Sequence, residues 1–353
     1  MSAAESTVSA PPGLVDLASE RLGGIALIAN DEFFAGKENL LKPGRGIFVP
    51  DKFTERGKWM DGWETRRRRT PGNDWCVVQL GLRGIIKEID IDTNHFLGNH
   101  PPSASFDALS WNRHPADVLS VHRPEADATF PLDIEEVQKL SWNTLLPQSP
   151  LRPGSQNLFS VRSDHTWTHV RLNIFPDGGV ARLRIYGTVV PDWSKLKPDD
   201  VIDLAAVENG GVALACSDMF FSSMNNLIMP GRAENMGDGW ETERRRGPGH
   251  DWIIMKLGTP GSIRKIEVDT NHFKGNYPDT CSIEGCTVPT ASIDELTSEK
   301  THWAEILPKT KLQADTRHVF ERELSPINRC THVRLNIFPD GGVSRLRIWG
   351  TAA

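Results

Sequence analysis

Apolar and polar side chains alternate along residues 168–179, THVRLNIFPDGG, from Val170 as far as Ile174. A two-residue period is typical of a β-strand with one face in a core. The Pro-Asp-Gly-Gly stretch that follows has the composition of a turn, and apolar residues return at Leu183 and Ile185. The pattern predicts a β-hairpin over residues 168–188.

Further strands are expected at 74–81, DWCVVQLG, and at 85–92, IIKEIDID. The first is almost continuously apolar, which indicates a strand buried on both faces. Helical periodicity is nearly absent, and DIEEVQKL at 133–140 is the best short candidate for a helix. Short strands with frequent Gly and Pro and no β-α-β alternation predict an all-β, antiparallel sandwich of the jelly-roll kind.

The whole pattern occurs twice. THVRLNIFPDGG returns at 331–342, and other stretches recur in the same order: DGWETRRRR as DGWETERRR, PGNDW as PGHDW, and DTNHFLGNHP as DTNHFKGNYP. We therefore expect two tandem β-sandwich modules, residues 14–190 and 201–353, with a Pro-containing linker at 191–200. The first copy carries about ten extra residues near 46–60 and more around 112–140, which we expect in surface loops.

Composition excludes some classes of function. The 353 residues carry 40 basic and 46 acidic side chains, a formal charge of −6, which argues against a nucleic-acid surface. The N-terminal residues lack a signal-peptide pattern, and no apolar run could span a bilayer. The cysteines are odd in number, scattered and without a CxxC pair, so we expect reduced thiols in a cytoplasmic protein: Cys76, Cys216, Cys281, Cys286 and Cys330.

The recurring polar residues are the candidates for chemistry. In DGWETRRRR, Glu64 and Arg67 recur as Glu241 and Arg244. A guanidinium fork suits a carboxylate or a urea-like carbonyl. The alternative is structural: Trp63 packs in the core, and the arginines are solvated or paired with carboxylates.

The stretch DTNHFLGNH contributes a second cluster. His95, next to a strand end at Asp92, titrates near neutrality and is a candidate general acid or base. Asp92, His95 and Glu64 are an equally open set of metal ligands, although their spacing is not diagnostic. The structural alternative is that Asp92 and Asn94 cap the turn while Phe96 lies in the core.

The predicted hairpin supplies a third cluster. Arg171, Asn173 and Arg182 are expected on its polar face, and they recur as Arg334, Asn336 and Arg345. Residues that only face solvent can be replaced by others without harm to the core, so this recurrence favours a binding or packing role.

Taken together, DGWET, DW, DTNHFxGN and NIFPDGG, each present twice, resemble the allantoicase (allantoate amidinohydrolase) family over residues 14–351. The resemblance implies two jelly-roll, galactose-binding-like modules and assembly into homo-oligomers. It also implies hydrolysis of a linear amidine C–N bond, which converts allantoate to ureidoglycolate and urea in allantoin breakdown. It implies no firm cofactor, and a divalent metal stays open.

Allantoate carries a carboxylate and two ureido groups, so its site needs guanidinium, amide and acid–base groups. We expect Glu64 or His95 to transfer the proton, with Asp92 orienting the histidine or a ureido group. The expected substrate-binding residues are Arg67, Asn99, His100, Arg171 and Arg182. Their counterparts in the second copy, with those of the catalytic residues, are Glu241, Asp269, His272, Arg244 and Arg334.

The two copies differ near these positions. Arg66 is replaced by Glu243, His100 by Tyr277 and Asn73 by His250, which slightly favours the first copy as the catalytic one. The rival hypothesis is a non-catalytic tandem module that binds carbohydrate, with Trp63 or Trp240 stacked on a sugar ring.

Overall fold

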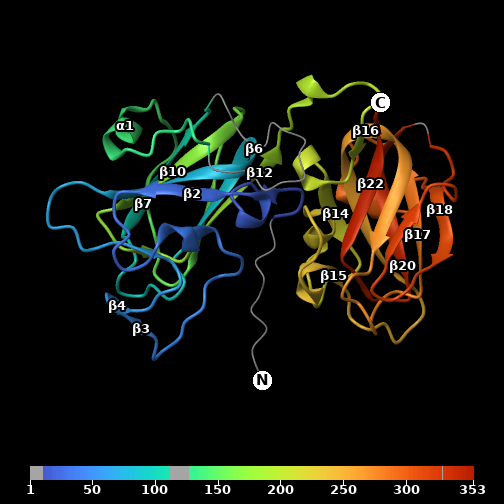
Figure 1. The fold of residues 1–353 in the computed structure, drawn as a ribbon, viewed down its shortest axis with the longest axis horizontal. Helices are drawn as coiled ribbons and strands as arrows, with labels where there is room; N and C mark the ends of the chain where they lie inside the picture. The colour runs from blue at the N-terminus through green and yellow to red at the C-terminus, as the bar shows by residue number, and fades with distance from the viewer. Residues whose placement is uncertain (1–10, 112–126, 328) are drawn as a thin grey trace. The chain divides into compact units, whose positions relative to one another are not determined.

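The computed structural model describes residues 11–111, 127–327 and 329–353. The chain divides into two compact units, Met1–Val190 and Pro191–Ala353, and each is a β-sandwich (Figure 1). The predicted all-β, tandem jelly-roll fold is confirmed. Part of the extra length expected around 112–140 lies outside the described residues.

Unit 1 is built around one long strand, β6. The neighbours run in the order β1-β12-β6-β10-β7-β8, and β2 and β9 also pair with β6. The strands of this sheet are β1 (Val15–Asp16), β2 (Ile25–Ala29), β6 (Asp74–Asp92), β7 (Ser103–Leu109), β8 (Asn143–Pro150), β9 (Gln156–Ser160), β10 (Trp167–Phe175) and β12 (Arg182–Val189). Two small ladders join β3 (Phe53–Thr54) to β4 (Gly57–Lys58), and β5 (Trp63–Glu64) to β11 (Gly179–Val180).

The two strands expected at 74–81 and 85–92 are one continuous strand, which corrects the prediction. The first half of β6 pairs with β10 and β2, whereas its second half pairs with β12 and β9. β6 therefore takes part in both layers of the sandwich. Residues from Asp74 to Leu82 are all buried, as expected for a strand covered on both faces.

The predicted hairpin over 168–188 is wrong in its pairing. Its two strands exist as β10 and β12, but each pairs with β6 rather than with the other. The turn between them leads into the short strand β11, which pairs with β5. Arg171 and Arg182 therefore belong to different layers, and the single polar face expected for them does not form.

Unit 2 repeats this topology with the order β13-β22-β16-β20-β17-β18. Its strands are β13 (Val201–Asp203), β14 (Val212–Cys216), β15 (Trp240–Glu241), β16 (Asp251–Asp269), β17 (Thr280–Cys286), β18 (Ala304–Lys311), β19 (Arg317–Phe320), β20 (Cys330–Phe338), β21 (Gly342–Val343) and β22 (Arg345–Ala352). The described helices are short. They are α1 (Ile134–Lys139), α2 (Ile293–Thr297) and 3-10 turns at Glu20–Leu22, Lys37–Leu41, Trp193–Lys195, Val207–Asn209, Met224–Ile228 and Met236–Asp238.

The segment with α1 covers the outer face of one layer of unit 1. Asp133 caps the helix by accepting the N–H groups of Glu135 and Glu136, as DIEEVQKL predicts. Below it lies an apolar cluster that includes Trp75, Phe130 and Val137, with Trp142 at its edge. The segment with α1 ends beside β10, and the site described below lies where the two meet.

The signature motifs are partly explained by packing. Trp63 and Phe96 are fully buried, as the structural interpretation of both motifs predicts. A Cβ at Gly179 would lie 2.0 Å from the Phe96 ring, so only glycine fits there. Gly342 meets Phe273 in the same way in unit 2. Among the residues that the structure describes, no helix has the length and apolarity to cross a membrane.

Candidate active site

Glu64 and Asn99 form the first of the predicted groupings. Asn99 Nδ2 donates a hydrogen bond of 2.6 Å to Glu64 Oε1, and the Asn99 carbonyl accepts the N–H of Gly179. Burial raises the pKa of the Glu64 carboxyl above its usual value, and the hydrogen bond from Asn99 opposes that shift only in part. Glu64 is therefore a half-buried carboxyl group whose proton is held more firmly than in water.

Asp92 and His95 do not join that pair. The Asp92 carboxylate forms an ion pair with Arg45 at 2.8 Å and accepts the N–H of Asn94. His95 is exposed and stacks on Phe48 at 5.5 Å. The Asp92 carboxylate thus caps the turn and binds Arg45, rather than orienting an imidazole.

The other expected substrate-binding residues are also dispersed. Arg182 is almost fully buried and pairs with Asp61 at 2.7 Å. Arg67 is exposed and makes no hydrogen bond or ion pair with any residue in the described part of the chain. His100 is half-buried, and its Nδ1 has no partner among the described residues. The expected single cluster of Glu64, His95 and Arg171 is not formed.

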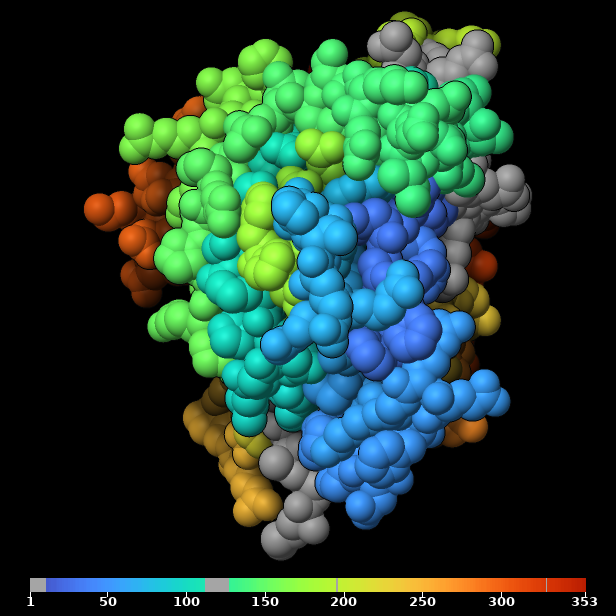
Figure 2. Space-filling model, turned by 90° about the vertical axis from the view of Figure 1, so that its left-hand side faces the viewer, coloured from blue at the N-terminus to red at the C-terminus, as the bar shows by residue number. Residues whose placement is uncertain are grey.

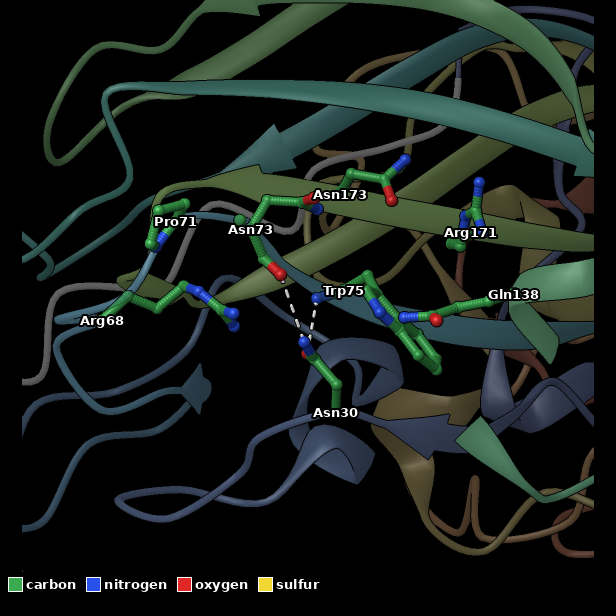
Figure 3. A pocket seen from close by; sticks show the side chains of 9 residues that line it. Asn30, Arg68, Pro71, Asn73, Trp75, Gln138, Arg171 and Asn173 are labelled. Atoms are coloured by element: carbon green, nitrogen blue, oxygen red, sulfur yellow. Dashed lines mark hydrogen bonds between the residues drawn. The ribbon is translucent and has the colours of Figure 1, made fainter. Parts of the chain in front are cut away.

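A pocket lies instead at the edge of β10, beside α1. It has a volume of about 400 Å³ and is lined by Asn30, Arg68, Pro71, Gly72, Asn73, Trp75, Gln138, Arg171 and Asn173. Arg68 and Arg171 stand at opposite ends, with Asn30, Asn73 and Trp75 between them (Figure 3). Figure 2 faces this side of unit 1, where blue, green and yellow-green segments that are far apart in sequence meet at the surface.

Arg171 is fixed at one end of this pocket by two neighbours, Asp107 and Trp142. Its Nε and Nη2 donate to Asp107 Oδ2 at 3.2 and 2.8 Å, and its guanidinium lies 4.8 Å from the centre of a Trp142 ring. Asn173 Nδ2 donates to the same Asp107 oxygen at 2.8 Å. These contacts use one edge of the guanidinium, so its remaining N–H groups stay available to a ligand.

Arg68 occupies the opposite end. Its Nη1 lies 2.6 Å from Asp74 Oδ1, and its backbone N–H donates to Asp177 Oδ2. Within the described part of the chain, Arg68 Nε is buried and has no hydrogen-bond partner. A buried donor of this kind is costly unless a ligand or water satisfies it.

The sequence pointed to only part of this pocket. Arg171, a residue that the sequence predicts for the site, lines the pocket, whereas the predicted Arg67 does not and its neighbour Arg68 does. Asn30, Trp75 and Gln138 were missed, since strand pairing and the cover by α1 bring them together from distant segments. The alternation of β10 does predict that Asn173 lies on the same face as Arg171, since the two are two residues apart in a strand.

The metal alternative finds no geometric support. Within 11–111, 127–327 and 329–353, no three His, Cys, Asp or Glu side chains are grouped so that they could hold a metal ion. Glu64, Asp92 and His95 each contact a different side chain: Asn99, Arg45 and Phe48.

The counterparts in unit 2 keep most of these contacts. Asn276 donates to Glu241, Arg334 pairs with Glu284 at 2.6 Å, and Asp269 accepts the N–H of Asn271. His272 differs from His95, because its Nε2 lies 2.9 Å from the Ala233 carbonyl. Arg244 is exposed, like Arg67.

The same repeat is found in proteins of known family. The model of the allantoicase repeat matches residues 15–190 and again residues 202–353. The chain belongs to the allantoicase family. Its membership extends over both units, and the matched segments together cover nearly the whole chain.

Individual relatives are similar to this chain over nearly their whole length. A protein of Burkholderia mallei named probable allantoicase 1 is 48% identical over 96% of this chain and 94% of that protein. A probable allantoicase of Pseudomonas aeruginosa is 48% identical over 96% of both chains. The crystal structure of allantoicase from Saccharomyces cerevisiae, 37% identical, covers 96% of this chain and 93% of that chain with a TM-score of 0.77.

Proposed function

We propose that this chain is a hydrolase that converts allantoate to ureidoglycolate and urea. The observation that carries the proposal is full-length membership of the allantoicase family, with about 48% identity to bacterial relatives. The pocket in unit 1 supports it through its chemistry, because it presents two arginines and several amide side chains but no exposed apolar wall of the kind that a lipid-like ligand would need.

Each part of allantoate has a chemical complement in this pocket. The carboxylate is suited to the free N–H groups of Arg171, since charge-assisted hydrogen bonds to a guanidinium are short and strong. The two ureido groups offer N–H donors and carbonyl acceptors, which the amides of Asn73, Asn173 and Gln138 can meet. Arg68 lines the other end of the pocket, where its guanidinium can bind a ureido carbonyl.

Hydrolysis requires one bond to break and one to form at the central carbon of allantoate. The C–N bond to one ureido group breaks, a bond to the oxygen of water forms, and the departing nitrogen receives a proton to leave as urea. A guanidinium near the ureido carbonyl stabilises the electron density that this group gains as it departs. Binding both ends of the substrate also holds the central carbon in one orientation for water.

For the proton transfer we propose Glu64. Glu64 is not among the residues that line the pocket, but the next residue, Thr65, and the pocket residue Arg68 hydrogen-bond to consecutive residues of one turn, Gly178 and Asp177. A carboxyl group with a raised pKa is better suited to deliver a proton near neutral pH than an ordinary one. His95, exposed and stacked on Phe48, is a weaker candidate.

The test is urea release from allantoate by the purified chain. We expect urea and ureidoglycolate to appear in equal amounts, in proportion to protein concentration. The rival carbohydrate-binding hypothesis predicts no urea, together with a thermal shift on addition of sugars. Its proposed stacking residues, Trp63 and Trp240, are both fully buried and offer no ring face to a sugar.

Two further properties belong to the same proposal. We expect homo-oligomers, as the family resemblance implies. Unit 1 exposes aromatic side chains suited to such a contact, among them Phe53 at 67%; light scattering of the purified chain gives the mass. We also expect a cytoplasmic location, consistent with free thiols at all five cysteines; cell fractionation tests it.

A further inference from the structure

The arginine sites of the two units differ at a few positions, among them Asn30 and Ser217, Asp107 and Glu284, and one at the start of the long strand. The stretch GNDW at 72–75 returns as GHDW at 249–252, so His250 stands where unit 1 has Asn73. Around this position the arginines, the tryptophan and the strand asparagine are the same in both copies. The matched pairs are Arg68 and Arg245, Arg171 and Arg334, Trp75 and Trp252, and Asn173 and Asn336.

In unit 2 the imidazole of His250 lies against the asparagine of the site. His250 Nε2 is 3.2 Å from Asn336 Oδ1, and the imidazole packs on the Phe338 ring at 4.6 Å. Asn336 Nδ2 donates to Ser282 Oγ at 3.2 Å and to Glu284 Oε2 at 2.9 Å. Both ends of the Asn336 amide are therefore satisfied within unit 2.

In unit 1 the matching asparagine is only half satisfied. Asn173 Nδ2 donates to Ser105 Oγ at 3.1 Å and to Asp107 Oδ2 at 2.8 Å. Within the described residues, Asn173 Oδ1 accepts no hydrogen bond from protein, and both Asn73 and Asn173 line the pocket. The asparagine carbonyl that contacts His250 in unit 2 corresponds in unit 1 to Asn173 Oδ1, and Asn173 lines the pocket together with Asn73 (Figure 3).

Another difference between the units preserves local structure rather than the site. In unit 1, Asn30 Oδ1 accepts the N–H of Trp75 at 2.8 Å. Its counterpart in unit 2 is Ser217, whose Oγ accepts the N–H of Trp252 at 2.9 Å. The exchange of Asn30 for Ser217 keeps the same strand-start hydrogen bond, whereas the exchange of Asn73 for His250 changes what the site asparagine can bind.

We infer that the side chain at this position decides which unit binds a ligand that carries both a carboxylate and a ureido group. Asn73 leaves Asn173 Oδ1 open to a ureido N–H. His250 occupies the matching acceptor, Asn336 Oδ1, in unit 2. The inference rests on the proposed function for the identity of the ligand. It makes Asn73 a specificity-determining residue and assigns one ureide site to each chain, in unit 1.

The experiment measures binding apart from turnover. N-carbamoylglycine, which has a carboxylate and a single ureido group, is titrated into the full chain by calorimetry, and urea release from allantoate is measured in parallel. The variants are N73H, which imports the imidazole of unit 2, and N73S, which leaves the space open. H250N makes the reverse exchange in unit 2 and serves as the matched control, with thermal unfolding as the check of folding.

We expect the wild type to bind one N-carbamoylglycine per chain. N73H should lose at least about tenfold in affinity and in kcat/KM, N73S should lose less than N73H, and H250N should stay within about threefold of wild-type kcat/KM. Wild-type binding by folded N73H, an equal loss in N73S, a tenfold loss in H250N, or no binding of the probe by the wild type would each overturn the inference. If N73H loses probe binding while the wild type releases no urea, the inference stands and the proposed reaction fails.

Discussion

Asn99 and Glu64 are joined by a hydrogen bond of 2.6 Å from the amide Nδ2 to the carboxyl Oε1, and Asn276 and Glu241 repeat the bond in unit 2. The two units therefore share the pair but differ beside it, where His100 of unit 1 is Tyr277 in unit 2. This duplication provides an internal control, because a purely structural role predicts the same effect of mutation in both units.

The first prediction concerns Glu64 as the group that transfers the proton. We expect E64Q to reduce kcat for urea release by at least about a hundredfold, because glutamine keeps the hydrogen bond from Asn99 but cannot deliver a proton. E241Q should stay within about threefold of the wild type. Equal, small effects of both substitutions on kcat would show that the pair is only structural.

The same substitution has a predicted pH signature in stability. Burial raises the pKa of Glu64 in the folded state, so its contribution to stability is fully present below the pKa of the unfolded chain, near 4.5. That contribution is lost as the pH rises through the folded pKa. E64Q cannot ionise, so its stability relative to the wild type should increase from pH 4 to pH 8 in denaturant titrations. A difference that does not change with pH would contradict the buried position of the carboxyl group.

A third prediction concerns the ion pair between Asp61 and Arg182. Both side chains are nearly buried, and removing one partner leaves an uncompensated charge, so D61N should cost about 3–5 kcal/mol of unfolding free energy at pH 7. R66A removes a far more exposed partner of Asp31 and should cost about 1 kcal/mol or less. Similar losses in the two variants would contradict the assigned burial.

The pH dependence of D61N follows from the pKa of Asp61. Burial alone would raise that pKa, but Arg182 and the N–H of Ile47 outweigh it and hold the pKa below the usual 3.8. The stabilisation by Asp61 is therefore present above pH 3.8 and is lost as the pH falls through the folded value. The difference in unfolding free energy between D61N and the wild type should therefore become smaller in acid.

The fourth prediction separates His95 from the catalytic groups. His95 has a φ of 67°, in the left-handed region that asparagine tolerates better than most residues, and its side chain is exposed. H95N should therefore fold normally and release urea within about threefold of the wild-type rate. A loss of more than about tenfold, with an unchanged unfolding midpoint, would return the acid–base role to His95.

Much of the fold could be predicted from patterning, because burial imposes its period on the sequence. The alternation in β10, the continuous apolar run at the start of β6 and the cap of α1 at Asp133 all have local causes. The pairing of β10 and β12 could not be predicted in this way. A strand such as β6 that joins both layers is specified by contacts far apart in sequence, and a turn alone does not show which strands pair across it.

The site was harder to predict for the same reason. Recurrence marked Glu64, Asp92 and Arg182 as important, but the structure gives each a separate protein partner: Asn99, Arg45 and Asp61. Residues that hold a duplicated fold together recur as reliably as residues that bind substrate. The exchange of Asn73 for His250 is visible in the sequence, but its meaning is not. Only the structure shows that Asn73 lines a pocket with Asn173 and that His250 contacts Asn336.

The most direct test of a ureide site in unit 1 compares Arg171 with its counterpart Arg334. R171A and R334A each remove an arginine that pairs with a carboxylate, Asp107 or Glu284, and lies over a tryptophan ring, so their structural costs are matched. For urea release from allantoate, we expect a loss of kcat/KM of at least about a hundredfold in R171A and of no more than about threefold in R334A. An R334A variant as impaired as R171A, or a folded R171A that keeps wild-type kcat/KM, would contradict a ureide site in the pocket of unit 1.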